Sequence, residues 1–257
     1  MANFLKSRNP ILSDKAMQSR FESTATQSES TSNSHLIVES DQIMTMQGAI
    51  NKTFTLLGIL MVTTLISYMM PSSLLMWTGI GGGLIAVLVA SFKPHTSPIA
   101  APVYAAFEGL FVGSISAIFA STMDGIVFQA VSLTFATLFS MLIIYKTGII
   151  KVTEKFKAGV MMATGAIMIM YLISIIGSFA GFQVPYLHEG GLMGVGLSLV
   201  IIGVAALNLL IDFDAFEKGV EAKAPKYMEW FVSLGLIVTL VWLYIEFLRL
   251  LAKLNSD

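Results

Sequence analysis

The chain has 257 residues, of which 55% are hydrophobic and only 12% are charged. Because soluble domains usually carry about 25% charged residues, this composition excludes a water-soluble fold and indicates a protein that contacts the lipid bilayer. The net charge of −1 excludes the basic surface of a nucleic-acid-binding protein, and the lack of cysteine excludes disulfides, thiolate metal sites and cysteine nucleophiles.

The N-terminal segment is polar. Residues 1–41 contain no apolar core of the length that a signal peptide requires, and the stretch ESTATQSESTSNS (residues 22–34) has no helical or strand period. Such a segment cannot bury enough apolar surface to offset the entropy lost on ordering. We therefore expect residues 1–41 to be a disordered tail and residues 42–257 to be a membrane domain.

Beyond the tail, long apolar runs alternate with short polar breaks. A helix needs about 20 apolar residues to cross a hydrocarbon core of roughly 30 Å. The runs are continuously apolar, without the alternation of a barrel wall. The sequence thus predicts an all-α integral membrane protein, a bundle of seven transmembrane helices. The expected spans are residues 53–70, 73–92, 99–121, 126–145, 158–180, 191–211 and 229–252.

Among the breaks between the spans, lysine occurs only in alternate ones. Lysine and arginine occur before the first span, and lysine occurs in the second, fourth and sixth breaks, for example at Lys93, Lys151 and Lys223. The first, third and fifth breaks (MPSS, STMDG and GFQVPYLHEGG) have none. Because cytoplasmic loops retain positive charge, we expect a cytoplasmic N-terminus and an external C-terminus.

Glycine pairs in the spans predict close helix packing. Their small-xxx-small spacing lets two transmembrane helices approach each other. The pairs are Gly79/Gly83, Gly109/Gly113, Gly177/Gly181 and Gly190/Gly194.

Ionisable side chains at bilayer depth are costly and are therefore candidates for function. Glu108 lies about nine residues into the third span, roughly 14 Å along a helix, with no basic residue near it in that span. Asp212 lies at the cytoplasmic end of the sixth span, so it and Glu108 are close enough in depth to face a common polar cavity. Glu246 lies nearer the external side, and its spacing of three from Arg249 predicts a local ion pair.

Helical spacing separates the two aspartates of the sixth span. Asn208 and Asp212 are four residues apart and share a face, whereas Asp214 lies about 200° around the helix from Asp212. For Asp212 two interpretations stay open, a helix-end residue near the headgroups or a residue that lines an ion pathway. Asp214 is expected to be a solvated charge at the helix end, paired with Lys218.

Three parts of the chain carry a likeness to a known family. They are AAFEGLFVGSIS (residues 105–116), IIYKTGIIKVTEKFKAG (residues 143–159) and the C-terminal stretches LLIDFDAFEKG, APKYMEWF and LVWLYIEFLRLLAKL. Over roughly residues 45–254 the chain resembles the Bax inhibitor-1/YccA-like family of seven-helix membrane proteins. The resemblance implies a bundle in which six helices surround the seventh, in a bacterial plasma membrane or its organelle equivalent.

The resemblance also implies a pH-sensitive Ca²⁺ leak, gated by a pair of aspartates that share protons. The sixth-helix aspartate of the family corresponds to Asp212 or Asp214. In the seventh helix, the pattern LYIEF aligns Glu246 with the second aspartate, whereas the distance from Arg249 aligns the uncharged Thr239. In the second case Glu108 would be the substitute partner.

From these residues we expect a carboxylate cluster of Asp212 with Asp214 or Glu108 at the cytoplasmic mouth of a cavity. Two carboxyl groups held close together in a low dielectric titrate as a unit. A shared proton would hold the helices together, and its loss would separate them and expose hard oxygen ligands from Asp212 and Asp214 for transient Ca²⁺ binding. No cofactor is expected.

An enzyme is the less favoured hypothesis for the function of this chain. An intramembrane aspartyl protease needs a second membrane aspartate and a glycine-rich setting, but residues 209–211 before Asp212 are Leu-Leu-Ile and the seventh span has no aspartate. A serine protease needs a histidine within the membrane, and the spans contain none. The alternative to a channel is a non-conducting interaction protein that modulates a membrane protease or a stress response.

Overall fold

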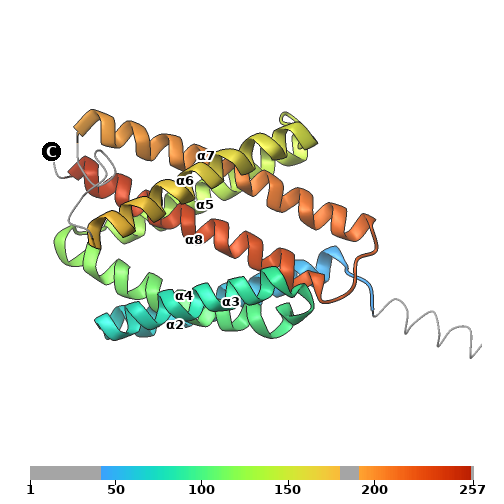
Figure 1. The fold of residues 1–257 in the computed structure, drawn as a ribbon, viewed down its shortest axis with the longest axis horizontal. Coiled ribbons are helices and arrows are strands. Elements are labelled where there is room, and N and C mark those ends of the chain that lie inside the picture. Colours follow the sequence, from blue (N-terminus) through green and yellow to red (C-terminus); the bar gives the residue numbers. More distant parts are fainter. Residues whose placement is uncertain (1–41, 180–190, 256–257) are drawn as a thin grey trace, which may run out of the picture. The chain divides into compact units, whose positions relative to one another are not determined.

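Helices account for nearly all of the residues that the structure describes (Figure 1). The computed structural model describes residues 42–179 and 191–255, and from Met44 onward these belong to one compact unit. The helices are α2 (Met46–Met69), α3 (Ser73–Phe92), the 3-10 helix η1 (Pro94–Thr96), α4 (Ser97–Thr122), α5 (Ile126–Thr147), α6 (Glu154–Phe179), α7 (Gly191–Glu221) and α8 (Met228–Asn255).

The helix ends follow local chemistry. The Thr45 hydroxyl accepts a hydrogen bond from Gly48 N and caps α2, and Ser72 caps α3 by accepting from Leu74 N. At both ends of α5 the chain turns through a left-handed conformation, with φ of 75° at Gly125 and 69° at Gly148. Glycine adopts this conformation without the steric cost that a Cβ atom imposes.

In the described ranges, seven helices are each long and apolar enough to cross a membrane. This confirms the predicted all-α bundle of a multi-pass integral membrane protein. The helices extend beyond the expected apolar spans: α2 begins at Met46 instead of residue 53, and α7 continues to Glu221 instead of ending near residue 211. A helix can continue into the polar region, so the end of an apolar run marks the edge of the hydrocarbon and not the end of the helix.

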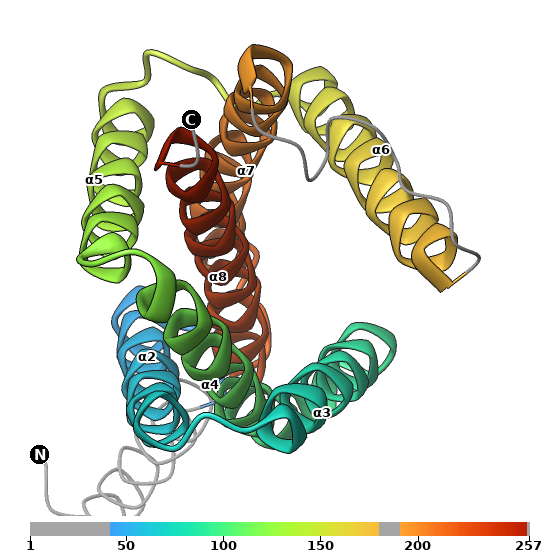
Figure 2. The same ribbon diagram turned by 90° about the vertical axis from the view of Figure 1, so that its left-hand side faces the viewer.

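Helix α8 is the central helix of the bundle. Within its most apolar stretch 78% of the residues are buried in protein, compared with 44% for α7 and 17% for α2, α5 and α6. It packs against α2, α4, α5 and α7, whereas α3 packs mainly on α4 and α6 mainly on α7. Figure 2 shows α8 in the middle, with α3 and α6 to its right.

Two of the predicted glycine pairs lie where helices come closest. A Cβ atom on Gly109 would lie 1.9 Å from Thr63 Oγ1 of α2, and one on Gly113 would lie 2.3 Å from the Thr64 carbonyl oxygen. Gly79 is equally close to α4, since its Cβ would lie 2.6 Å from Phe111 N. The other two pairs include Gly181 and Gly190, which lie outside the described residues.

The start of α2 is tied to the start of α8. Met44 N donates a hydrogen bond of 2.7 Å to the Ala224 carbonyl. Glu229 Oε1, fully buried in the first turn of α8, accepts from Thr45 N at 3.0 Å and from the Thr45 hydroxyl at 3.1 Å. Lys226 Nζ lies 3.2 Å from the same oxygen. The carboxylate thus satisfies a backbone donor at the N-terminus of α2, where negative charge is favourable.

Candidate functional site

A cavity of about 530 Å³, apolar over most of its lining but with several polar side chains, lies between α3, α6, α7 and α8. It is lined by five of the residues that the sequence singled out, Asn208, Asp212, Thr239, Glu246 and Arg249. Polar groups from other positions also line it: Ser91, Thr164, Tyr171 and Trp242. The structure therefore brings together side chains from four helices that are separate in the sequence.

Asp212 lies inside α7, about two and a half turns before the helix ends at Glu221. Its carboxylate points toward α8: a Cβ atom on Gly235 would lie 3.5 Å from Asp212 Oδ1, and the Thr239 side chain is close enough to interact with the carboxyl group. Asp212 Oδ2 is buried without a hydrogen-bond partner, and Asp212 forms no ion pair within the described residues. The interpretation of Asp212 as a residue at the end of its helix is therefore wrong, because α7 continues past it to Glu221.

Asn208 lies one turn from Asp212 on the same face of α7, as its spacing predicted. Its Nδ2 group donates to the Thr164 hydroxyl of α6 at 2.8 Å and to the Val204 carbonyl at 2.9 Å. Since both contacts use the amide NH₂ group, the side-chain oxygen keeps its capacity to accept a hydrogen bond or to bind a cation.

Glu246 lies about two turns along α8 from Thr239, roughly 10 Å at 1.5 Å per residue. It is buried and forms the predicted ion pair with Arg249, whose Nη1 lies 3.3 Å from Oε1. The Tyr171 hydroxyl of α6 donates to the same oxygen at 2.5 Å. Of the two seventh-helix candidates, Thr239 is therefore the one that faces Asp212, and Glu246 has a counter-charge of its own.

Asp214 faces α6, away from the cavity. Its Oδ2 lies 2.6 Å from Lys157 Nζ and 3.1 Å from Lys218 Nζ. The predicted pair with Lys218 is confirmed, but the prediction of a solvated charge is wrong, because Asp214 is only 8% exposed. The sequence did not indicate Lys157 as a partner, since α6 and α7 meet only in the folded bundle. Asp214 thus connects α6 to α7.

Glu108 does not line the cavity. Its carboxylate lies against α3, where a Cβ atom on Gly83 would be 2.7 Å from Glu108 Oε2. The hydroxyl of Tyr104, which lies on α4 like Glu108 itself, interacts with the carboxylate. No hydrogen bond or ion pair in the described part of the chain joins Asp212 to either Asp214 or Glu108. Over the same residues, no group of three or more His, Cys, Asp or Glu side chains could hold a metal ion.

Sequence reasoning missed Trp242 and Tyr171. Trp242 Nε1 is buried without a hydrogen-bond partner in the described structure, as is Asp212 Oδ2, and both residues line the cavity. One is a donor and the other an acceptor, and a buried group of either kind is costly without a partner. In the sequence, an aromatic residue that lines a cavity looks the same as one that packs in the core, because both stand in apolar runs at the same helical spacing.

Among the comparisons with known proteins, no curated protein and no solved structure matches the chain. A family model does match it: the one described as Bax inhibitor 1 like covers residues 9–256, which include all of α2 to α8. This agrees with the resemblance found in the stretches around Glu108, Asp212 and Glu246. The chain belongs to the Bax inhibitor 1 like family.

Proposed function

We propose that this chain is a pH-sensitive cation leak, with Ca²⁺ as the conducted ion and Asp212 as the residue that senses protons. The pathway includes the cavity between α3, α6, α7 and α8. We place the N-terminus inside because of the lysine and arginine distribution, and the family membership favours a bacterial plasma membrane.

The main observation in support of this proposal is the environment of the Asp212 carboxylate. One of its oxygens is buried and has no hydrogen-bond partner among the described residues, and no basic side chain neutralises it. An ionised carboxylate in such a place is costly unless a counter-charge joins it. A proton or a cation can supply that charge, so the two compete for the same group. This competition makes a leak depend on pH.

Nearby oxygen atoms suit a hard cation. Ca²⁺ binds carboxylate, amide and hydroxyl oxygens together with water. Asn208 has a side-chain oxygen free to accept, and Thr239 lies opposite Asp212 on α8. Because these three residues alone cannot complete a coordination sphere, the ion keeps water and binds weakly. Weak binding favours passage over retention.

The gate in this proposal is the contact between α7 and α8 beside Gly235. When Asp212 is protonated, the neutral carboxyl group can hydrogen-bond to Thr239 and hold the two helices together. When Asp212 is ionised, the carboxylate draws in water and a cation and separates them. Asp214 stays with Lys157 and Lys218 and supports the structure, so the cluster expected from the sequence reduces to Asp212 and its uncharged neighbours.

The test is Ca²⁺ and K⁺ flux in liposomes that hold the purified protein, at about pH 6 and about pH 8, on either side of neutrality. We expect a Ca²⁺ leak that is larger at the higher pH, and Asp212→Asn should abolish the difference. Asp124→Asn makes the same chemical change at an exposed position between α4 and α5 and should leave the pH profile intact.

Two results would overturn the proposal. An unchanged pH profile in Asp212→Asn removes Asp212 as the sensor. The absence of flux from correctly folded protein at both pH values removes the leak itself and favours the non-conducting interaction protein, which co-purification with a membrane protease would then test.

A further inference from the structure

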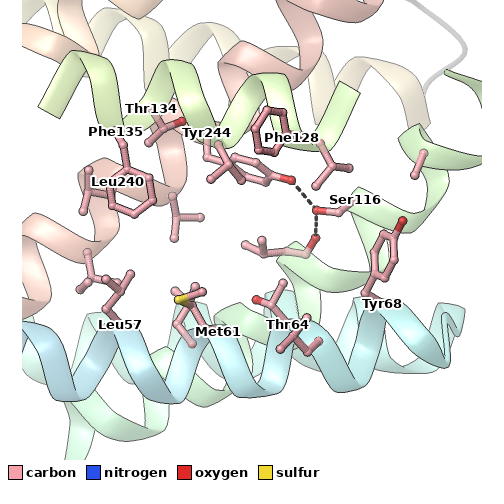
Figure 3. Close-up of a pocket in the computed structure, with 18 of the residues that line it drawn as sticks. Leu57, Met61, Thr64, Tyr68, Ser116, Phe128, Thr134, Phe135, Leu240 and Tyr244 are labelled. Carbon is pink, nitrogen blue, oxygen red and sulfur yellow. Dashed lines mark hydrogen bonds between the residues drawn. The ribbon is translucent and has the colours of Figure 1, made fainter. Parts of the chain in front are cut away.

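A second, apolar groove lies on the other side of α8. Its volume is about 570 Å³, and its lining is almost entirely hydrocarbon. Figure 3 shows the groove between α2 and α5, with residues of α4 and α8 between them. The α8 residues that line it, including Leu240 and Tyr244, differ from those that line the cavity containing Asp212.

The open side of the groove faces the bilayer. Met61 and Leu65 on α2 and Phe128 on α5 line it, and they are 53%, 58% and 77% exposed. These positions lie within helices that span the membrane, so their exposed surface contacts lipid and not water. The groove is therefore continuous with the lipid-facing surface, and its occupant comes from the hydrocarbon phase.

The length of the groove matches one leaflet. On α2 its lining extends from Leu57 to Tyr68, a rise of roughly 16 Å along the helix. The hydrocarbon core is roughly 30 Å thick, so the groove reaches from one edge of the core to about its middle. A linear chain from one leaflet fits this shape better than a compact ligand does.

Most of the hydroxyl groups lie at one end of the groove, whereas the Thr134 hydroxyl at the other end is already bonded to the Ala130 carbonyl. Tyr68 lies at the last turn of α2, and in the part of the chain that the structure describes the buried Thr64 hydroxyl has no hydrogen-bond partner. The Ser116 and Tyr244 hydroxyls lie 2.6 Å apart at the same end (Figure 3). Tyrosine is favoured at the membrane interface. The Tyr68 side chain is exposed, and its hydroxyl can donate to an ester carbonyl, which is the first polar group above an acyl chain.

We propose that this groove binds one acyl chain of a bilayer phospholipid. The ester end of the chain lies near Tyr68 and Thr64, and the methyl end lies near Leu57 and Phe135. The site does not depend on ion conduction, because it lies on a different face of α8 from the cavity that contains Asp212.

The test uses the full chain in phosphatidylglycerol vesicles that contain a phospholipid with a photoreactive diazirine near its acyl-chain terminus. Mapped cross-links should concentrate in the groove near Leu57 and Phe135. Native mass spectrometry of the purified protein should show a retained phospholipid. Val131→Trp, which fills the mouth of the groove from α5, should lose both signals.

Val89→Trp is the matched control, since Val89 has similar exposure on α3 (43%, against 38% for Val131) and lines neither cavity. It should keep the retained lipid and the cross-links. Leu65→Trp closes the groove from α2 and should repeat the loss if Val131→Trp does not fold. Cross-links spread evenly over all exposed helices, lipid retained in both groove variants, or retention of a free fatty acid alone would each overturn the proposal.

Discussion

Asp212 on α7 faces Gly235 on α8, and a Cβ atom on Gly235 would lie 3.5 Å from Asp212 Oδ1. This separation is an ordinary van der Waals contact, so the position has room for a methyl group and for little more. The two residues face each other across the α7–α8 contact, which is where the proposed gate lies.

The effect of a substitution at Gly235 should therefore depend on the size of the new side chain. Gly235→Ala should fold as well as the wild type, and alanine favours the helix by roughly 0.5–1 kcal/mol. Its Ca²⁺ flux should be retained. Gly235→Leu places a branched side chain where the Asp212 carboxylate lies, and we expect it to reduce flux strongly. Flux in liposomes checks both, with gel filtration to confirm folding. A folded Gly235→Leu protein with wild-type flux would contradict the location of the gate.

Glu229 should be a stability residue and not a transport residue. Glu229→Gln removes the charge that satisfies Thr45 N and pairs with Lys226, and hydrogen bonds to charged groups contribute about 1.5–3 kcal/mol. We expect a loss of that order in the free energy of unfolding, measured by titration with sodium dodecyl sulfate in mixed micelles. Glu221→Gln, at an exposed position at the end of α7, is the control and should change little. Equal stability of the two variants would show that the α2–α8 contact does not depend on Glu229.

The number and order of the spans could be predicted because apolarity is a local property of each run. The ends of α2 and α7 could not. Asp212 and its following residues are polar enough to suggest water, yet the helix continues to Glu221 because nothing in that stretch breaks it. Met46 likewise precedes the apolar run but follows a Thr45 cap, and the cap sets the start of the helix.

The site was predictable where it depends on spacing within one helix. Asn208 with Asp212 and Glu246 with Arg249 follow from separations of four and three residues. The contacts of Tyr171 with Glu246 and of Lys157 with Asp214 join residues that are far apart in the sequence, and no local pattern encodes them. The distance-based alignment of Thr239 was the better guide to the residue that faces Asp212, because α7 and α8 are antiparallel and the connection between them sets their register.

The close approach of α2 and α4 should make Gly109 intolerant of any side chain. A Cβ there would lie 1.9 Å from Thr63 Oγ1 and 2.5 Å from the Leu60 carbonyl oxygen, which belongs to the backbone and cannot rotate away. Gly109→Ala should cost about 1–3 kcal/mol of stability, as overpacking does. The thermal unfolding midpoint in detergent measures it.

Gly58→Ala is the control for Gly109→Ala. Gly58 lies on α2, the helix that Gly109 of α4 packs against, and a Cβ at Gly58 would meet nothing within 4 Å. Its midpoint should equal or exceed that of the wild type. Adding Thr63→Ala to Gly109→Ala should recover part of the loss and not all of it, since the contact with the Leu60 carbonyl remains. Full tolerance of Gly109→Ala would mean that the two helices are further apart than described.

The ion pair of Lys157 with Asp214 should contribute more to stability than its neighbour, the pair of Lys218 with Glu154. In the first pair the charged atoms are 2.6 Å apart, and the side chains are 20% and 11% exposed. In the second pair the charged atoms are 3.4 Å apart, and the side chains are 47% and 84% exposed. Water screens exposed pairs, whose coupling is typically about 0.2–1 kcal/mol, and screens buried pairs less. Double-mutant cycles with Lys→Met and acid→amide changes should give a coupling above about 1 kcal/mol for the first pair and below about 0.5 kcal/mol for the second. Equal couplings would mean that Asp214 is as hydrated as Glu154, and would restore it as a candidate ligand for cations.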